Sequence, residues 1–277
     1  MARKPRLVAL LSVEFKIVPG FAAAIMRILL LSDIHSNLEA LKAVLDAAPR
    51  HDLVWNLGDV VGYGANPNEV IDRVRGLGSI FVRGNHDKAC CGIGGIEAFN
   101  PIAARAAQWT HDSLTPENLE WLRQLPAGPI TPVGSEVTCS HGSPLDEDEY
   151  LMTLRDAWLP LTQTLARINF FGHTHVQGGF ATNGEEWFQL KPEFSVSGAD
   201  EYESPLRENA RYLINPGSVG QPRDRDWRAA FAIYEVEDHA RQRIMFYRVP
   251  YDVKQAQEKI LAAGLPNRLA SRLSEGR

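Results

Sequence analysis

Residues 26–37 read MRILLLSDIHSN, an apolar run that ends in a polar and charged segment. A continuous apolar run of this length is typical of a strand that is buried on both faces of a parallel sheet. The pattern recurs at residues 53–59, which read LVWNLGD, and at residues 79–87, which read SIFVRGNHD. Segments 38–48 and 66–75, between these runs, carry apolar residues at helical spacing. This order predicts right-handed βαβ units and a parallel sheet.

The chain beyond residue 130 is richer in short strands. Two dipeptides, Gly134-Ser135 and Asn183-Gly184, are typical of the turns of β-hairpins. The runs 229–236 and 241–249 are expected to pair around residues 237–240. Strand–helix units followed by short strands predict a protein of the α/β class.

The composition excludes several classes of protein. Of the 277 residues, 44% are hydrophobic and 23% are charged, which is ordinary for a globular chain and excludes a disordered or collagen-like one. The formal net charge of −5 provides no basic field that would attract a nucleic-acid polymer or an anionic membrane. Three cysteines cannot form a disulfide framework and fit a reducing cytosol. No apolar run approaches the roughly 18 residues that span a bilayer, so we expect a cytoplasmic protein without a membrane partner.

Residues 1–25 form a separate segment. A basic start, a short apolar stretch and an alanine-rich end resemble a secretory signal, but Glu14 and Lys16 interrupt the apolar stretch. We expect an extension outside the fold, with Met26 as the functional start, and a secretory signal is the alternative. Residues 26–277 contain no repeat or linker and are predicted to form one domain, whose oligomeric state is left open.

Five short polar segments follow apolar runs, and they carry the residues that could bind a metal or take part in catalysis: Ser32–Asn37, Gly58-Asp59, Arg83–Asp87, Ser140–Gly142 and Phe171–His175. In open α/β sheets, ligands bind beyond the carboxyl ends of the strands, so these segments are expected to converge. Asp, His and Asn supply oxygen and nitrogen ligands without thiolate, a mixture that suits Mn, Fe, Zn, Co or Ni. Each segment alone could be a turn or a hydrogen-bonded core histidine, but the five together predict a metal site.

In an extended strand, side chains two residues apart point to the same face. If the first strand continued, Asp33 and His35 would point to one face, and the same holds for His173 and His175.

In this order, the motifs D-x-H, GD, GNHD, HG and GHTH resemble those of the calcineurin-like metallophosphoesterases, and the similarity spans residues 26–247. The run VRGNHD at residues 82–87 and NPGS at residues 215–218 resemble the small prokaryotic phosphodiesterase branch, including diadenosine-polyphosphate hydrolase-like members. The resemblance implies an α/β fold in which two mixed β-sheets are flanked by helices, an αββα sandwich.

The resemblance also implies two divalent transition-metal ions, with Mn first and Fe, Zn, Co or Ni as alternatives. The implied ligands are divided between the two ions, with one carboxylate shared: Asp33, His35 and His175 at the first, Asn85, His141 and His173 at the second, and Asp59 between them. No ligand position is missing, which favours an enzyme over a catalytically silent metal-binding scaffold, the alternative from a different class.

Two cations roughly 3.5–4 Å apart can generate hydroxide near neutral pH and stabilise charge at phosphorus. The resemblance implies attack by a hydroxide that bridges the ions, with His86 facing the leaving group as an acid or charge stabiliser. Asp87 would fix the tautomer of His86, or else cap the backbone. Arg83 is a candidate for binding substrate phosphate, and an ion pair below the site is the alternative. Asn37 is a candidate for substrate binding, with a turn-capping role as the alternative.

We therefore predict a phosphoesterase that hydrolyses phosphodiester or phosphoanhydride bonds of nucleotides or dinucleoside polyphosphates. The alternative within the class is a phosphomonoesterase, including a serine/threonine protein phosphatase. The acidic residues 145–150 and the polar residues 195–209 could form a rim over the metals, and such a rim disfavours long polyanions.

Further predictions concern two aromatic side chains and one charged stretch. Tyr63 and Trp55 are candidates for stacking on a base, but Trp55 lies within a strand and is expected in the core. The stretch at residues 221–228, QPRDRDWR, is predicted to be a solvated cluster in which its arginines pair with Asp224 and Asp226.

Overall fold

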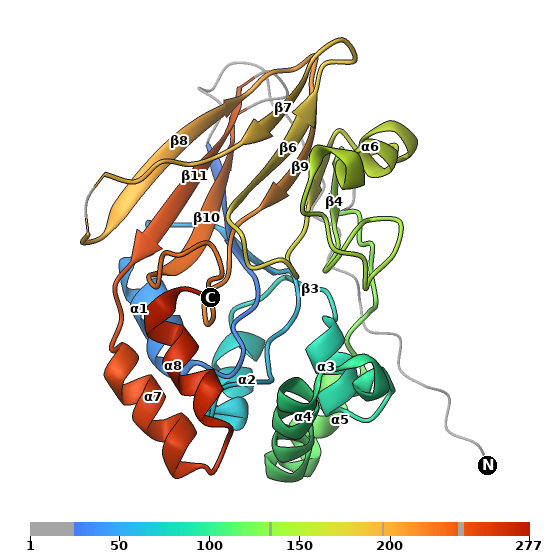
Figure 1. Ribbon diagram of the computed structural model, residues 1–277. Helices are drawn as coiled ribbons and strands as arrows, with labels where there is room; N and C mark the ends of the chain where they lie inside the picture. Colours follow the sequence, from blue (N-terminus) through green and yellow to red (C-terminus); the bar gives the residue numbers. More distant parts are fainter. Residues whose placement is uncertain (1–24, 133–134, 196, 238–240) are drawn as a thin grey trace, which may run out of the picture.

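Two β-sheets packed face to face form the centre of the molecule, and helices cover both outer faces (Figure 1). The computed structural model describes residues 25–132, 135–195, 197–237 and 241–277. The first sheet contains, in spatial order, β3 (Ile80–Phe81), β2 (Leu53–Asn56), β1 (Met26–Leu31), β10 (Ala229–Val236), β11 (Gln242–Val249) and β8 (Asp200–Leu206). The second sheet contains β4 (Val137–Cys139), β5 (Ile168–Phe170), β9 (Arg211–Asn215), β6 (Gly178–Thr182) and β7 (Trp187–Leu190).

Both sheets are mixed. In the first, β1, β2 and β3 are parallel, as the βαβ pattern predicts, while β10, β11 and β8 are antiparallel to their neighbours. In the second, β4, β5 and β9 are parallel and β6 and β7 are antiparallel.

Strand β1 shows why its sequence is continuously apolar. Successive side chains of a strand point to opposite faces. Leu29 and Leu31 pack into the core between the first sheet and its helices, whereas Ile28 and Leu30 pack into the core between the two sheets. Trp55 lies in the same inter-sheet core and is 4% exposed, which confirms its predicted position.

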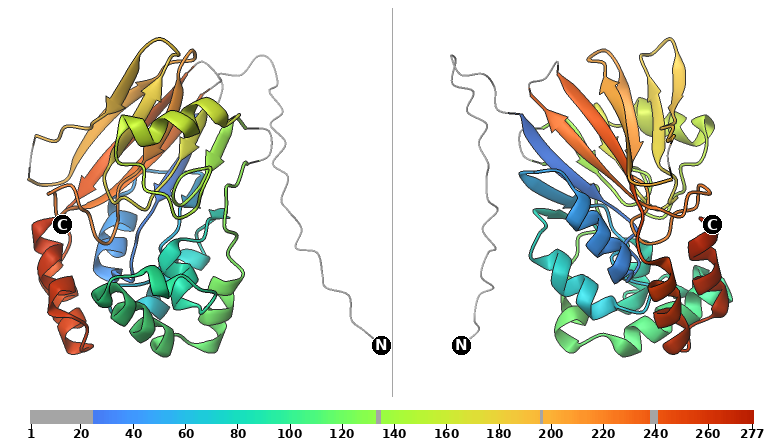
Figure 2. Two further views of the ribbon diagram at one scale, coloured as in Figure 1. Left: turned by 45° about the vertical axis from the view of Figure 1, so that its right-hand side comes forward. Right: turned by 90° about the vertical axis from the view of Figure 1, so that its left-hand side faces the viewer.

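The helices divide unequally between the two outer faces (Figure 2). Apolar residues of most helices pack into the core on the first sheet, namely those of α1 (Leu38–Ala47), α2 (Pro67–Arg75), α4 (Pro101–Ser113), α5 (Pro116–Arg123), α7 (Val253–Ala262) and α8 (Asn267–Glu275). Helix α6 (Leu154–Gln163) packs on the second sheet through Ala157 and Leu161. The short helices α3 (Asn85–Cys90) and η1 (Ile96–Ala98) follow β3. The predicted αββα sandwich is confirmed.

The hairpin predictions are confirmed where the structure describes them. Asn183-Gly184 lies between the paired strands β6 and β7, and β10 pairs with β11. Residues 133–134 and 238–240, in the other expected turns, and residues 1–24 lie outside the described residues. The assignment of residues 26–277 to one domain stays a prediction. Within the described parts of the chain, no helix is both long and apolar enough to cross a membrane.

Candidate metal centre

The five polar segments meet where five strands end. Asp33 and His35 follow β1, Asp59 follows β2, Asn85 is the first residue of α3 after β3, His141 follows β4, and the remaining two histidines follow β5. Strands β1 to β3 belong to one sheet and β4 and β5 to the other, so the site lies across the ends of both sheets.

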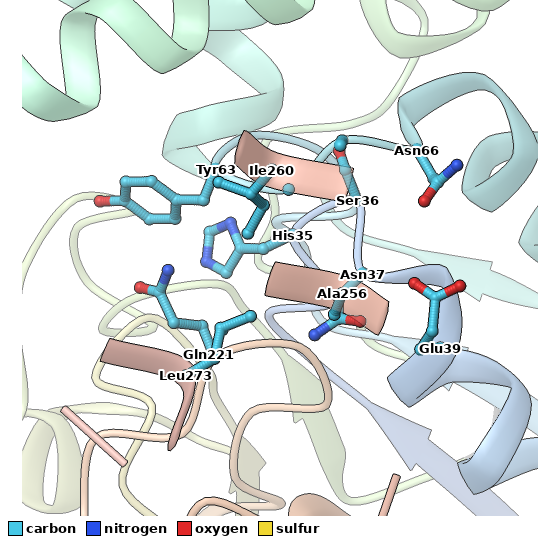
Figure 3. A pocket seen from close by; sticks show the side chains of 12 residues that line it. His35, Ser36, Asn37, Glu39, Tyr63, Asn66, Gln221, Ala256, Ile260 and Leu273 are labelled. Carbon is cyan, nitrogen blue, oxygen red and sulfur yellow. The ribbon is translucent and has the colours of Figure 1, made fainter. Parts of the chain in front are cut away.

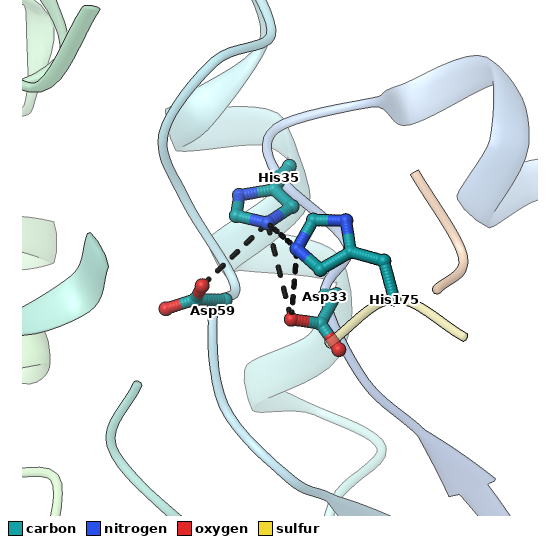
Figure 4. A group of neighbouring side chains, drawn as sticks. All are labelled: Asp33, His35, Asp59 and His175. Carbon is teal, nitrogen blue, oxygen red and sulfur yellow. Dashed lines mark hydrogen bonds and ion pairs between the residues drawn. The ribbon is translucent and has the colours of Figure 1, made fainter. Parts of the chain in front are cut away.

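The first half of the site is formed by Asp33, His35, Asp59 and His175, drawn in Figure 4. His175 Nε2 lies 3.2 Å from Asp33 Oδ1, and His35 Nε2 lies 3.5 Å from Asp59 Oδ2. The Nε2 atoms of the two histidines are 3.0 Å apart. All four side chains are buried, with ligand atoms within 4.8 Å of one another.

The second half shares Asp59 with the first. Asp59 Oδ2 lies 3.4 Å from His141 Nε2, and that nitrogen is 3.1 Å from Asn85 Oδ1 and 3.1 Å from His173 Nδ1. The structure therefore brings all seven predicted ligands together, and it places Asp59 between the two halves. Their assignment to particular ions stays a prediction.

Each of the four ligand histidines has one ring nitrogen within hydrogen-bond distance of a backbone carbonyl oxygen. Backbone carbonyls can only accept, so they assign the imidazole protons to the outer nitrogens. The four contacts are His35 Nδ1 with Val61 O at 3.1 Å, His175 Nδ1 with Gln221 O at 2.6 Å, His141 Nδ1 with Leu57 O at 2.8 Å, and His173 Nε2 with Asp148 O at 3.2 Å.

This tautomer assignment tests whether the residues fit metal ions. In the first half of the site, the unprotonated Nε2 atoms of His35 and His175 face each other at 3.0 Å. Facing lone pairs repel each other, whereas a cation that both can bind removes the repulsion. The donor set of imidazole, carboxylate and amide groups thus fits divalent transition-metal ions.

The pKa values also indicate that the site favours positive charge. Burial raises the pKa of Asp33 to about 7. Burial opposes the charged form of His141, but the facing Asp59 carboxylate raises the pKa of His141 to about 10. Burial would raise the pKa of Asp59 as well, yet His141 and His86 lower the pKa of that carboxyl well below its usual range. Two buried carboxylates and a strongly basic imidazole are the environment that a divalent cation would stabilise.

The backbone at the ligands differs from the expected strand. Five ligand positions adopt left-handed conformations, with φ between 50° and 66°: Asp33, His35, Asp59, His173 and His175. Strand β1 has already ended at Leu31, so the expectation that alternation along a strand orients these side chains is wrong. Asp and His tolerate the left-handed region better than most residues, which suits them to these tight loops.

His86 and Asp87 do not form the expected pair. The two carboxylate oxygens of Asp87 accept from Val61 N–H at 3.1 Å and Gly84 N–H at 3.0 Å, so Asp87 caps the backbone. His86 Nδ1 is buried without a hydrogen-bond partner among the described residues. The proposed role of Asp87 in fixing the His86 tautomer is therefore wrong. Burial also lowers the pKa of His86 to about 4, and its ring packs against Tyr63 and Phe99.

Arg83 forms the ion pair that was the alternative to phosphate binding. Its Nη2 lies 3.2 Å from Glu147 Oε2, and Lys88 Nζ lies 3.1 Å from the other oxygen of the same carboxylate. These contacts fix residues 145–150 beside the metal site, where the Tyr150 ring lies 3.8 Å from the ring of His173. The rim predicted for residues 145–150 is thus present. Within residues 195–209, Asp200–Leu206 form β8, which pairs with β11, and the rim predicted for that stretch stays a prediction.

Both polar side-chain atoms of Asn37 bond to the protein backbone. Its Oδ1 accepts from Ala40 N–H at 3.1 Å, which caps α1, and its Nδ2 donates to Gly220 O at 2.8 Å. We therefore correct the substrate-binding role to a structural one. Asn215, in contrast, supports the ligand loop, because its Nδ2 donates to Gly172 O at 2.8 Å and Thr174 Oγ1 at 3.0 Å.

The sequence reasoning missed Arg223. The pairing predicted within residues 221–228 is confirmed for Arg228 and Asp226, whereas Asp224 pairs with Arg248 outside this stretch, and among the described residues Arg223 pairs with neither aspartate. The charge of Arg223 instead lowers the pKa of His175, after burial the largest cause of that shift. No local signal in the sequence could show which arginines the two aspartates would pair with.

The chain belongs to the calcineurin-like phosphoesterase superfamily, because the model of that superfamily's domain matches residues 26–239. The protein is therefore a phosphoester hydrolase that uses divalent metal ions, as its sequence motifs predict.

Similar proteins agree with this assignment. Uncharacterized protein MJ0912 of Methanocaldococcus jannaschii is 38% identical over 253 residues, which cover 90% of this chain and 98% of that protein. The crystal structure of a metallophosphoesterase from Sphaerobacter thermophilus is 38% identical, with a TM-score of 0.77 and coverage of 92% of this chain and 100% of that one. A symmetrical bis(5'-nucleosyl)-tetraphosphatase of Yersinia enterocolitica is 33% identical over 115 residues, which are 36% of each chain.

Proposed function

We propose that the protein hydrolyses phosphodiester or phosphoanhydride bonds of nucleotides, with dinucleoside polyphosphates as the first candidate substrates and Mn²⁺ as the first candidate metal. The observation that supports this most directly is the complete set of seven donors, six of them buried, in which the unprotonated Nε2 atoms of His35 and His175 face each other. A catalytically silent scaffold would have no need to keep every donor.

The chain's own residues would hold the two cations and stabilise the departing oxygen. Asp33, His35 and His175 would hold one cation, the residues of the second half would hold the other, and Asp59 would contact both. Bound divalent cations supply a nucleophile from water at neutral pH and neutralise charge on phosphate oxygens. His86 is neutral near pH 7, because burial lowers its pKa to about 4, so it would donate an N–H hydrogen bond to the departing oxygen.

The substrate class is supported by charge and by one relative. The formal net charge of −5 and the acidic residues 145–150 disfavour long nucleic acids but leave small nucleotides accessible. The partial match to a symmetrical bis(5'-nucleosyl)-tetraphosphatase supports a phosphoanhydride substrate.

The test is a screen of the purified protein, loaded with Mn²⁺, over nucleotides, dinucleoside polyphosphates and bis(p-nitrophenyl) phosphate. Hydrolysis of a dinucleotide at the highest kcat/KM is the expected result. Hydrolysis restricted to monoesters would replace the proposal with a phosphomonoesterase. Two bound ions per chain without hydrolysis of any ester would identify a scaffold.

A further inference from the structure

Two arginine side chains from distant segments converge beside the metal centre. Arg223 lies in the loop between β9 and β10, and Arg272 lies on α8. Their guanidinium carbons are 5.8 and 5.9 Å from the centroid of the Tyr63 ring. That ring lies 4.7 Å from the ring of His35 and 4.2 Å from the ring of His86. Tyr63 is only 7% exposed, so it supports the two arginines and is not available for the base stacking that its sequence position suggested.

Neither arginine pairs with an aspartate or glutamate side chain among the described residues. Arg223 Nη2 donates to Gln221 Oε1 at 3.1 Å, and its Nε is buried without a partner. Arg272 Nε donates to the main-chain oxygen of Arg277, the last residue of the given sequence. The nearby aspartates at positions 224 and 226 pair with other arginines. Burial and the charge of Arg223 together lower the pKa of Arg272 to about 10, which shows that the two cations disfavour each other.

The loop that carries Arg223 is fixed to the metal site. Arg223 N–H donates to the carbonyl of His175 at 3.1 Å, and Gln221 O accepts from Nδ1 of the same histidine at 2.6 Å. The charge of Arg223 also affects the pKa values of Asp33 and His35. Arg223 is therefore close enough to act on a substrate held at the metals.

Helix α8 is fixed to the same loop. Arg225 N–H donates to the carbonyl of Gly276 at 2.9 Å, and a Cβ atom on Gly276 would lie 2.8 Å from the Arg225 backbone. Leu273 of α8 lines a pocket together with His35 and Gln221. His35 and Gln221 lie at the same end of this pocket as Tyr63 (Figure 3). The C-terminal helices, which lie beyond the residues that the family model matches, thus form part of the wall beside the site.

Two guanidinium groups that lack an aspartate or glutamate partner, beside a phosphoesterase centre, fit one kind of ligand. Guanidinium binds phosphate oxygens through two parallel N–H donors, and an anion between two cations removes their repulsion. We propose that Arg223 and Arg272 bind the phosphate group next to the one attacked, so that the enzyme selects substrates with two or more linked phosphates. This inference rests on the proposed function and specifies its substrate class.

The test compares Arg272→Gln and Arg223→Gln with Arg268→Gln. Arg268 is a matched control, because it lies one turn before Arg272 on α8, its side chain is 50% exposed, and it pairs with Glu275. We expect kcat/KM for diadenosine tetraphosphate to fall about tenfold more than kcat/KM for bis(p-nitrophenyl) phosphate in the first two variants, the effect of one lost charged hydrogen bond. Metal content should stay the same, and Arg268→Gln should change neither rate. Equal losses on both substrates would overturn the inference.

A second measurement separates this inference from the proposed function. Inorganic pyrophosphate, with free metal in excess, should inhibit bis(p-nitrophenyl) phosphate hydrolysis by the wild type more strongly than by Arg272→Gln. If the wild type cleaves no dinucleoside polyphosphate but this difference remains, the substrate is wrong and the subsite stands. Equal inhibition constants would remove the subsite whatever the substrate. Should Arg272→Gln melt early, Arg272→Lys keeps the charge without the planar pair of donors and should show a smaller loss of the same kind.

Discussion

Gly84 offers the sharpest test of the metal centre, because its side of the backbone faces Asp59. A Cβ atom at Gly84 would lie 2.1 Å from Asp59 Oδ1 and 2.3 Å from the Asp59 backbone nitrogen, where ordinary contacts are 3.4–4 Å. Gly84 has φ −92° and ψ 171°, which alanine adopts without strain, so Gly84→Ala acts through contact alone. The carboxylate that both halves of the site share must then move by roughly 1 Å.

We expect three effects of Gly84→Ala. A misplacement of 1 Å lowers kcat/KM by about 10²-fold. Overpacking lowers the free energy of unfolding by about 1–3 kcal/mol, which lowers the Tm by roughly 2–12 °C. The bound metal should fall below that of the wild type, since displacement of the Asp59 carboxylate changes the position of Oδ2, the oxygen that faces His35 and His141.

The assays are metal content by atomic emission, hydrolysis of bis(p-nitrophenyl) phosphate, and thermal melting with excess Mn²⁺. Gly76→Ala is the matched control, because its Cβ would meet nothing closer than 4.0 Å and its φ is −82°. That variant should melt within about 1–2 °C of the wild type and keep its activity. Full metal content and full activity in Gly84→Ala would refute the placement of Asp59 between two ions.

Four further predictions concern single side chains and the metals. Asp59→Asn should lose at least one ion and reduce activity by several orders of magnitude with the fold retained, because a neutral amide cannot neutralise two cations; metal analysis and circular dichroism check this. His86→Ala should keep both ions and slow turnover by about 10²–10⁴-fold on esters with poor leaving groups but much less on nitrophenyl esters, and equal slowing would assign it another role. If Arg83 acts by fixing residues 145–150, Glu147→Gln should slow turnover. The variant that combines Arg83→Gln with Glu147→Gln should then be no slower than Arg83→Gln alone. Faster turnover in Glu147→Gln would show instead that Arg83, freed from its ion pair, binds phosphate. Burial raises the pKa of Asp33 from 3.8 to about 7, so in EDTA-treated protein the stability that its proton provides is present below pH 4 and lost as the pH rises through 7. The Tm difference between metal-loaded and EDTA-treated protein should therefore increase from pH 5 to pH 8, and a constant difference would contradict this.

The metal site could be predicted from the sequence because its information is local. Each ligand lies within a few residues of an apolar strand, and parallel strands of one sheet bring their carboxyl ends to one edge. Asp33 and Asp59 therefore meet although they come from two separate segments, and His141 and His173 join Asp59 from the ends of two parallel strands of the other sheet. The order of the motifs identified the family, and the family model confirms it.

The roles of the surrounding residues could not be predicted, because they depend on which partner each polar group finds. Asp87 was expected to contact its neighbour His86, but the backbone turns its carboxylate toward Val61 and Gly84. Asn37 is predicted to bind substrate, but its amide oxygen caps α1. Side chains with several possible partners have no local pattern that selects one of them.

Arg272 shows the limit of motif reasoning most clearly. It lies on a C-terminal helix beyond the matched residues, and only the packing of α8 on the loop at residues 221–228 brings it to the site.

The left-handed ligand positions link the stability of the site to its metals. A left-handed conformation costs about 1–2 kcal/mol for a residue other than glycine, so such positions persist only where the surroundings fix them. Here the ligand loops bond to one another: Asp33 N–H donates to Gly58 O and His35 N–H donates to Asp59 O, both at 3.0 Å, and Gly220 N–H donates to Asp33 O at 3.0 Å. These backbone bonds hold the donors in place independently of the metals, so metal removal should lower stability without unfolding the site. Binding then requires little rearrangement, and the free energy of binding appears as increased stability of the native state.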